Sequence, residues 1–192
     1  MILNGATPTW QGFTLGATLI GSGGTRFSLH VDDNTSANGD FNLRNDIAYI
    51  YDPNSPETPA EIRDAYNEIL AETETAENFI EYLQDSFGGF VERNGGVNPF
   101  AATVDLRLIK RFSMKESKHG LEFSADVFNF ANLLNKDWGN NNNFSRRRDF
   151  MRINGFDQTA QRYTYGVQTG AGTEPIGGVP WRLQLGVRYT FN

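Results

Sequence analysis

A group of oxygen-bearing side chains between residues 32 and 40 could hold a hard cation. Carboxylate and carboxamide oxygens are the ligands that calcium prefers, and a glycine among them permits a tight loop. The candidate ligands are Asp32, Asp33, Asn34, Asn38 and Asp40. The spacing does not complete an EF-hand loop, because the twelfth position falls on Asn45 where that motif needs glutamate. We therefore prefer the alternative interpretation, in which these side chains bond to their own turn.

A cluster of arginines further along the chain could bind an anion. Guanidinium groups form paired hydrogen bonds with phosphate and carboxylate oxygens. The candidates, for lipopolysaccharide phosphates or an anionic ligand, are Arg146, Arg147, Arg148 and Arg152. The same arginines could instead pair with the acidic residues of the chain, which has a formal net charge of -6.

Residues that would support enzymatic chemistry are sparse. The sequence has no cysteine, no Gly-x-Ser-x-Gly elbow and no phosphate-binding loop, and its two histidines, His30 and His119, lack the spacing of metal ligands. The acidic pI of about 4.9 also argues against a nucleic-acid partner, which would need a basic surface. We expect neither catalysis nor a cofactor.

The last segment, residues 181–191, has the clearest pattern in the chain. Apolar residues occupy every second position, which predicts a β-strand with one apolar face. The segment is about as long as a tilted strand that crosses a bilayer. Trp181 at one end, with Tyr189 and Phe191 at the other, would fall at the two aromatic girdles of a membrane barrel.

Three further segments alternate in the same way, at about 10–20, 103–114 and 121–131, and the first could resume through residues 27–31. Lys110 interrupts the apolar face of the second. The polar faces carry charges that would point into a barrel lumen and pair with one another: Asp105, Arg107, Arg111, Glu122, Asp126, Arg182 and Arg188.

The connections between these segments differ greatly in length. Residues 115–120 form a short polar turn, whereas 32–100 and 132–180 are long. Bacterial barrels have short periplasmic turns and long extracellular loops, so both long segments are predicted to be extracellular. A capping box at 58–61 predicts a helix over 59–72, and spaced apolar residues predict another over 76–87. The second long segment has no period and is predicted to be irregular.

These observations predict an all-β fold: an antiparallel transmembrane β-barrel fragment of about four C-terminal strands with long extracellular loops, the first carrying short helices. The mean hydropathy of -0.48 excludes helical membrane spans. Two alternatives stay open. One is a small porin-like or structural barrel formed by oligomerisation, and the other is a soluble β-sandwich that binds a ligand.

Several phrases in order resemble one family. They are 39–40, 44–51, 92–95, 104–107, 126–139 and 186–191, and together with the strand pattern the likeness covers about 10–192. The chain resembles the C-terminal part of a TonB-dependent receptor, of the Bacteroidota type that carries a carboxypeptidase-regulatory-like domain at its N-terminus. One departure is that Asn192 follows Phe191 at the end, where family members finish on an aromatic residue.

The resemblance implies active uptake of a scarce nutrient across the outer membrane of a Gram-negative bacterium. Its implied partners are outer-membrane lipid and lipopolysaccharide, a small-molecule, glycan or peptide ligand, and TonB, which would act through a plug that this sequence lacks. Such a receptor has a barrel of roughly 22 strands. Because the N-terminal residues also lack the features of a secretory signal, we expect this sequence to be the tail of a longer polypeptide.

Overall fold

The computed structural model describes residues 1–32, 34, 36–113, 119–173 and 176–191. The chain forms two compact units, each assembled from segments far apart in sequence. We call residues 1–23, 100–141 and 176–192 the sheet unit, and residues 24–99 and 142–175 the loop unit. Within the described residues, no helix has both the length and the apolar character needed to cross a membrane.

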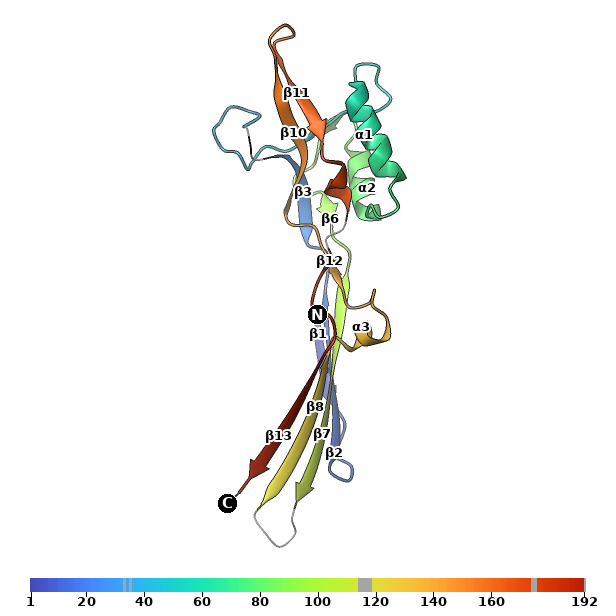
Figure 1. Ribbon diagram of the computed structural model, residues 1–192, viewed down its shortest axis with the longest axis vertical. Helices are drawn as coiled ribbons and strands as arrows, with labels where there is room; N and C mark the ends of the chain where they lie inside the picture. Colours follow the sequence, from blue (N-terminus) through green and yellow to red (C-terminus); the bar gives the residue numbers. More distant parts are fainter. Residues whose placement is uncertain (33, 35, 114–118, 174–175, 192) are drawn as a thin grey trace. The chain divides into compact units, whose positions relative to one another are not determined.

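The sheet unit contains one antiparallel sheet of five strands, in the order β1-β2-β7-β8-β13 (Figure 1). These strands are β1 (Ile2–Ala6), β2 (Phe13–Ser22), β7 (Ala101–Ser113), β8 (Gly120–Phe128) and β13 (Arg182–Thr190). Strands β1 and β13 form the two edges, so the described residues make an open sheet and not a closed barrel. We call the long segments between β2 and β7 and between β8 and β13 the two excursions. Both leave the sheet and return to it at the same end, where β2 and β8 finish and β7 and β13 begin.

The sheet has five strands, one more than the four predicted. The segment predicted at 10–20 begins as a strand only at Phe13, because residues 10–13 form the tight turn of a hairpin with β1. Gln11 and Gly12 at the centre of this turn have φ values of 47° and 80°. Positive φ at both central residues is the geometry of a type I′ turn, whose twist suits a β-hairpin. The turn therefore adds β1 to the sheet.

The segment predicted at 121–131 is shorter than expected, because β8 ends at Phe128. Asn129 adopts a left-handed conformation with a φ of 52°, and helix α3 (Phe130–Leu134) follows. The Asn129 backbone N–H donates to Asp105 Oδ1 at 2.8 Å, and its Nδ2 donates to the carbonyls of Gly139 and Val179. This asparagine thus turns the chain out of the sheet. The short strands β9 (Asn141–Asn142) and β12 (Ile176–Gly177) pair beyond this point.

The loop unit is built around a second sheet, in the order β11-β10-β3-β6. Its strands are β3 (Arg26–Val31), β6 (Gly96–Val97), β10 (Arg147–Asp157) and β11 (Arg162–Val167). The prediction that 132–180 is irregular is wrong, because β10 and β11 form a hairpin there, followed by the 3-10 helix η1 (Thr169–Gly172). Strands β10 and β3 are parallel, which also departs from the expected antiparallel pairing. A small ladder of β4 (Tyr49–Ile50) and β5 (Gly89–Phe90) completes the unit.

Two helices lie on one side of this sheet (Figure 1): α1 (Ala60–Ala71) and α2 (Glu77–Asp85), close to the predicted ranges 59–72 and 76–87. The predicted capping box is absent. Pro59 occupies the N-cap position of α1, and the Thr58 hydroxyl donates to the Asp52 carbonyl at 2.5 Å instead of capping the helix.

Aromatic side chains from both long excursions form the core of the loop unit. The Phe144 ring lies 4.9 Å from that of Phe27 and 5.6 Å from that of Phe79, and Phe150 contacts both Phe79 and Tyr66. Except for Phe144, which is 3% exposed, these residues are completely buried. Burial of several aromatic side chains supplies much of the free energy of folding, so the excursions stabilise one another.

Candidate functional site

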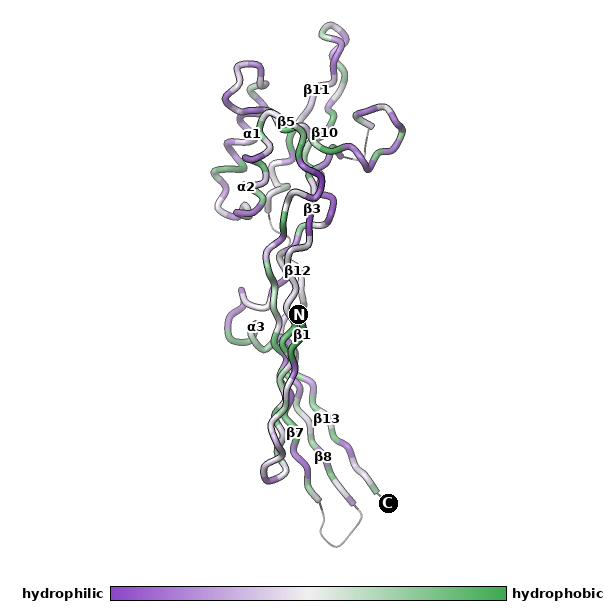
Figure 2. The backbone as a smooth tube through the Cα atoms, turned by 180° about the vertical axis from the view of Figure 1, so that it is seen from behind, coloured by the Kyte–Doolittle hydropathy of each residue, from purple (hydrophilic) through white to green (hydrophobic). Residues whose placement is uncertain are grey.

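The five-stranded sheet has one apolar face. Its register aligns residues of like character across neighbouring strands; one such row is Leu15, Leu108, Ala125 and Leu185. The three leucines of this row are 47%, 44% and 72% exposed. Figure 2 shows the alternation of apolar and polar residues along β7, β8 and β13. A broad exposed apolar face is what a lipid-contacting barrel wall presents.

The opposite face of the sheet is polar, and several of its charges are paired. Arg107 Nε lies 3.4 Å from Asp126 Oδ1, and Arg111 Nε lies 2.6 Å from Glu122 Oε2. The register places Arg188 opposite Glu122, and Arg182 lies over the Phe128 ring at 5.5 Å. The predicted lumen charges therefore share one face, and several of them bind one another.

Aromatic residues gather at the end of the sheet where β7 finishes and β8 begins; most of the turn predicted at 115–120 lies outside the described residues. Tyr189 stacks on Phe191 at 6.0 Å and on His119 at 5.7 Å, and its hydroxyl lies 2.8 Å from His119 Nδ1. Phe112 and Phe123 meet edge to face at 5.9 Å on the neighbouring strands. Trp181, 43% exposed, precedes β13 at the other end of that strand. This placement agrees with two girdles, and the girdle role itself stays a prediction.

Lys110 contacts the aromatic residues at this end of the sheet, which the sequence alone did not indicate. Its Nζ lies 3.9 Å from the Phe13 ring centre and 5.0 Å from that of Phe112, and it donates to the Gln11 carbonyl at 2.8 Å. The side chain thus carries its charge from the apolar face toward the turn at 10–13, as lysines at membrane interfaces do.

The calcium candidates hold a turn. Asp32 accepts hydrogen bonds from the backbone and side chain of Asn34, and Asp40 accepts from Asn42, Asn45 and Ser36. These hydrogen bonds keep the pKa of Asp40 below its usual value, and the bond from Asn45 contributes most. Asp33 lies outside the described residues. Among those described, no group of three or more His, Cys, Asp or Glu side chains is placed to hold a metal ion.

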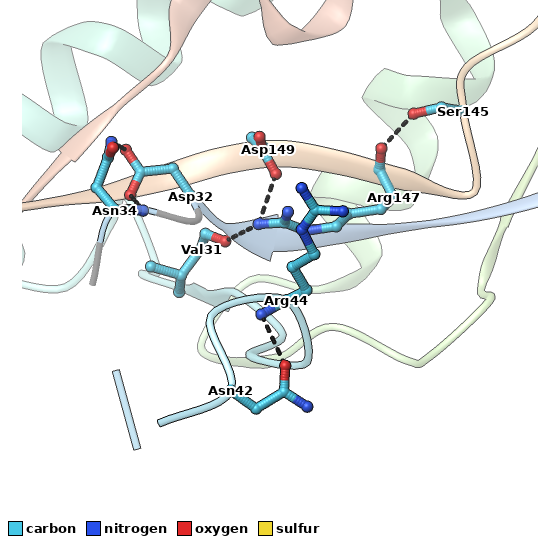
Figure 3. A network of polar contacts seen from close by, with 8 residues as sticks. All are labelled: Val31, Asp32, Asn34, Asn42, Arg44, Ser145, Arg147 and Asp149. Atoms are coloured by element: carbon cyan, nitrogen blue, oxygen red, sulfur yellow. Dashed lines mark hydrogen bonds and ion pairs between the residues drawn. The ribbon is translucent and has the colours of Figure 1, made fainter. Parts of the chain in front are cut away.

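The four arginines divide into two held by the fold and two at the surface. The Arg147 guanidinium donates to the Val31 carbonyl at 2.7 Å and lies 2.9 Å from Asp149 Oδ1 (Figure 3). Arg148 donates to the carbonyls of Ala171 and Gly170 at 2.6 and 3.0 Å, and burial lowers its pKa. Arg146 and Arg152 are exposed. The four therefore do not form one anion site, because two of them hold the loop unit together.

A cavity of about 430 Å³ lies in the loop unit. Residues from β3, β4, β5, β10, β11 and the turn before β4 line it: Val31, Ala37, Asn38, Asn45, Asp46, Ile47, Tyr49, Tyr51, Phe90, Met151 and Tyr165. Its volume is in the range of small-molecule sites, roughly 300–1,000 Å³. Asn38 was a calcium candidate and residues 44–51 were one of the phrases of the family resemblance, but neither pattern indicated a cavity.

Comparison with known proteins agrees with the membrane-facing sheet. No curated protein and no solved structure matches the chain. A family model described as an outer membrane beta barrel domain matches residues 6–165. This match spans β2, β7 and β8 together with most of the loop unit. The chain therefore belongs to the outer membrane beta barrel domain family, and it is an outer-membrane protein with a mostly β fold.

Proposed function

We propose that this chain is the C-terminal part of the barrel of a TonB-dependent receptor, and that its loop unit contributes to the capture of a scarce nutrient. In this proposal the plug and the segment that contacts TonB belong to parts of the receptor outside this sequence. The outer membrane of a Gram-negative bacterium is the expected location.

The observation that carries the proposal is that both long excursions leave the same end of a lipid-facing sheet and fold into one unit with its own core and cavity. Long loops of bacterial barrels face the outside, where a ligand would arrive. A passive pore does not need a packed unit of this kind, whereas a receptor needs a surface that holds its ligand.

The edges of the sheet support a larger barrel. Within the described residues, β1 and β13 each pair on one side only. Unpaired backbone groups at a strand edge cannot persist in the hydrocarbon core, so further strands must continue the sheet on both sides. In a receptor those strands would come from the same polypeptide. In the porin-like alternative they would come from other copies of this chain.

The native polypeptide distinguishes these two possibilities. An antibody raised against residues 140–160 would be used to detect it in outer-membrane fractions, and its intact mass would be measured. We expect a mass several times the 21.5 kDa of this sequence. A mass of 21.5 kDa would contradict the receptor proposal and favour an oligomeric barrel.

TonB contact is tested with the same antibody. After crosslinking in living cells, we expect TonB in the material that the antibody captures, and less of it from a control strain whose TonB lacks its C-terminal domain. A large polypeptide that never crosslinks to TonB would point to a large passive barrel instead.

A further inference from the structure

Four aromatic rings line the cavity of the loop unit: Tyr49, Tyr51, Phe90 and Tyr165. The Tyr49 ring lies edge to face with those of both Tyr51 and Phe90, with 5.3 Å between centres in each pair. Tyr49 is 39% exposed and Phe90 is 69% exposed, so parts of these rings are open to a ligand. The faces of such rings carry partial negative charge and attract cations.

A buried carboxylate lies among the same lining residues. Asp46 is only 7% exposed, and its Oδ2 accepts a hydrogen bond from the Ala37 backbone N–H at 2.7 Å. Among the described residues, Arg107 pairs with Asp126, Arg111 with Glu122 and Arg147 with Asp149, and Asp46 takes part in none of these ion pairs. A buried carboxylate without a counter-charge is costly, and a cationic ligand would relieve that cost.

The basic groups nearest in the structure are engaged elsewhere or neutral. His30 lies close to it, and burial, with Arg147 and Arg93, lowers the pKa of His30 to about 4, so the imidazole is neutral at pH 7. Arg93 is exposed and donates to the Asn45 carbonyl, and Arg147 pairs with Asp149. The described lining itself contains neither lysine nor arginine.

Two asparagines of the lining are partly engaged. Asn38 Oδ1 accepts from the Ser36 hydroxyl and the Asp40 backbone, and Asn45 Nδ2 donates to Asp40 Oδ2 at 2.6 Å. Asn45 Oδ1 is buried and has no hydrogen-bond partner among the described residues, so the charged and free groups of the lining include two acceptors, this amide oxygen and the Asp46 carboxylate, and no cation. An anion would meet a carboxylate of like charge, and a metal ion would find a single carboxylate among the described lining residues.

From these observations we propose that the cavity binds a ligand through an organic ammonium group, which would lie against the aromatic rings and beside Asp46. The group could come from a free quaternary amine or from a lysine side chain of a peptide. This inference rests on the proposed function, because it names the chemical class that the loop unit would capture.

The test measures binding of three probes to the full chain by calorimetry, in a detergent whose headgroup contains no amine. The probes are choline, its neutral isostere with a tert-butyl group in place of trimethylammonium, and a short peptide with one lysine. We expect choline to bind about tenfold more tightly than the isostere. If the lysine peptide binds much more tightly than choline, the source is a peptide; the reverse order points to a free amine.

Two variants and two matched controls connect this binding to the cavity. Asp46→Asn keeps an acceptor for Ala37 but removes the charge, and Tyr49→Leu keeps apolar bulk but removes the ring; each should weaken choline binding about tenfold. Asp64→Asn, at an exposed acid on α1, and Tyr163→Leu, at a tyrosine with the same 39% exposure, should leave it unchanged.

Several results would overturn the proposal: no probe binds, the isostere binds as tightly as choline, or a neutral sugar or an anion binds more tightly than either amine. These outcomes are separate from those for the receptor. Choline binding by a native polypeptide of 21.5 kDa would contradict the receptor and leave the cavity assignment in place. A large polypeptide that crosslinks to TonB but binds no ammonium probe would support the receptor proposal and contradict only the proposed ligand class.

Discussion

His30 couples the folding of the loop unit to pH. It lies on β3, is 5% exposed, and its Nδ1 has no hydrogen-bond partner among the described residues. Its pKa of about 4 in the folded chain is below the ordinary 6.5, mainly because burial disfavours the charged form. Between these two values the unfolded chain binds more protons than the folded chain. The stability present above pH 6.5 is therefore lost as the pH falls toward 4.

We expect the loop unit to lose roughly 2 kcal/mol of stability between pH 7 and pH 5 from this residue. Urea unfolding followed by the near-ultraviolet circular dichroism of the buried tyrosines would measure it. His30→Gln, which stays neutral throughout, should flatten the pH dependence over this range. An unchanged slope in that variant would mean that other groups cause the acid sensitivity.

Lys110 and Leu106 lie on the same face of β7 and differ in their distance from the turn at 10–13. A lysine near the interface costs little, whereas one near the middle of the bilayer costs about 2–4 kcal/mol. We expect Leu106→Lys to reduce the amount of native polypeptide assembled in the outer membrane severalfold, and Lys110→Arg to leave it unchanged. The measurement is the heat-modifiable band in outer-membrane fractions.

Arg107→Lys serves as the control for this comparison, because it places a lysine on the same strand but on the polar face, beside Asp126. Equal assembly of Leu106→Lys and Arg107→Lys would show that the apolar face of the sheet does not contact lipid.

At the scale of elements, β10 holds the 3-10 helix η1 through one arginine, within the second long segment. Arg148 donates to two carbonyls of η1, and its guanidinium lies 5.4 Å from the centre of the Phe144 ring. Lysine cannot reproduce the two directed bonds, so Arg148→Lys should destabilise the loop unit by about 1–3 kcal/mol. Thermal unfolding would measure this loss. Arg146→Lys, two residues away and exposed, should have no effect, and equal losses in both variants would contradict this role for Arg148.

A comparison of β13 with β10 shows why some elements could be predicted and others could not. β13 alternates strictly because one of its faces is apolar and the other polar, so its bounds of 182–190 differ by one residue at each end from the expected 181–191. β10 interrupts its alternation with a bulge between Asp149 and Met151 and pairs in parallel with β3, about 120 residues earlier in the chain. The alternation pattern of a short segment does not indicate which distant strand it pairs with.

At the scale of the whole molecule, the candidate sites also show that local sequence patterns do not reveal contacts between distant segments. Clusters of like residues in sequence, at 32–40 and 146–152, proved to hold turns and strands in the described residues. The cavity, by contrast, draws Asp46, Phe90 and Tyr165 from three distant segments. Its aromatic and acidic residues could be read from the sequence, but their proximity depends on the core that the two excursions form together.

Topology in the membrane gives the last prediction. From sequence alone, 146–148 would be the natural point for trypsin to cut on intact cells, but Arg147 and Arg148 lie within β10 and are bonded there. Arg44 is exposed in a turn outside any strand and should be cut first. Lys115 and Lys118 lie outside the described residues, in the segment that joins the end of β7 to the start of β8, and should be spared.

Mass spectrometry of the fragments would identify the sites, and cells with a permeabilised outer membrane provide the control, because there both ends become accessible. Extended, exposed segments are the preferred sites of proteolysis, so cleavage at Arg44 in intact cells would place the loop unit outside. Cleavage at Lys115 or Lys118 in intact cells, with Arg44 protected, would reverse the orientation. The cavity would then face the periplasm, where it could not capture a ligand arriving from outside.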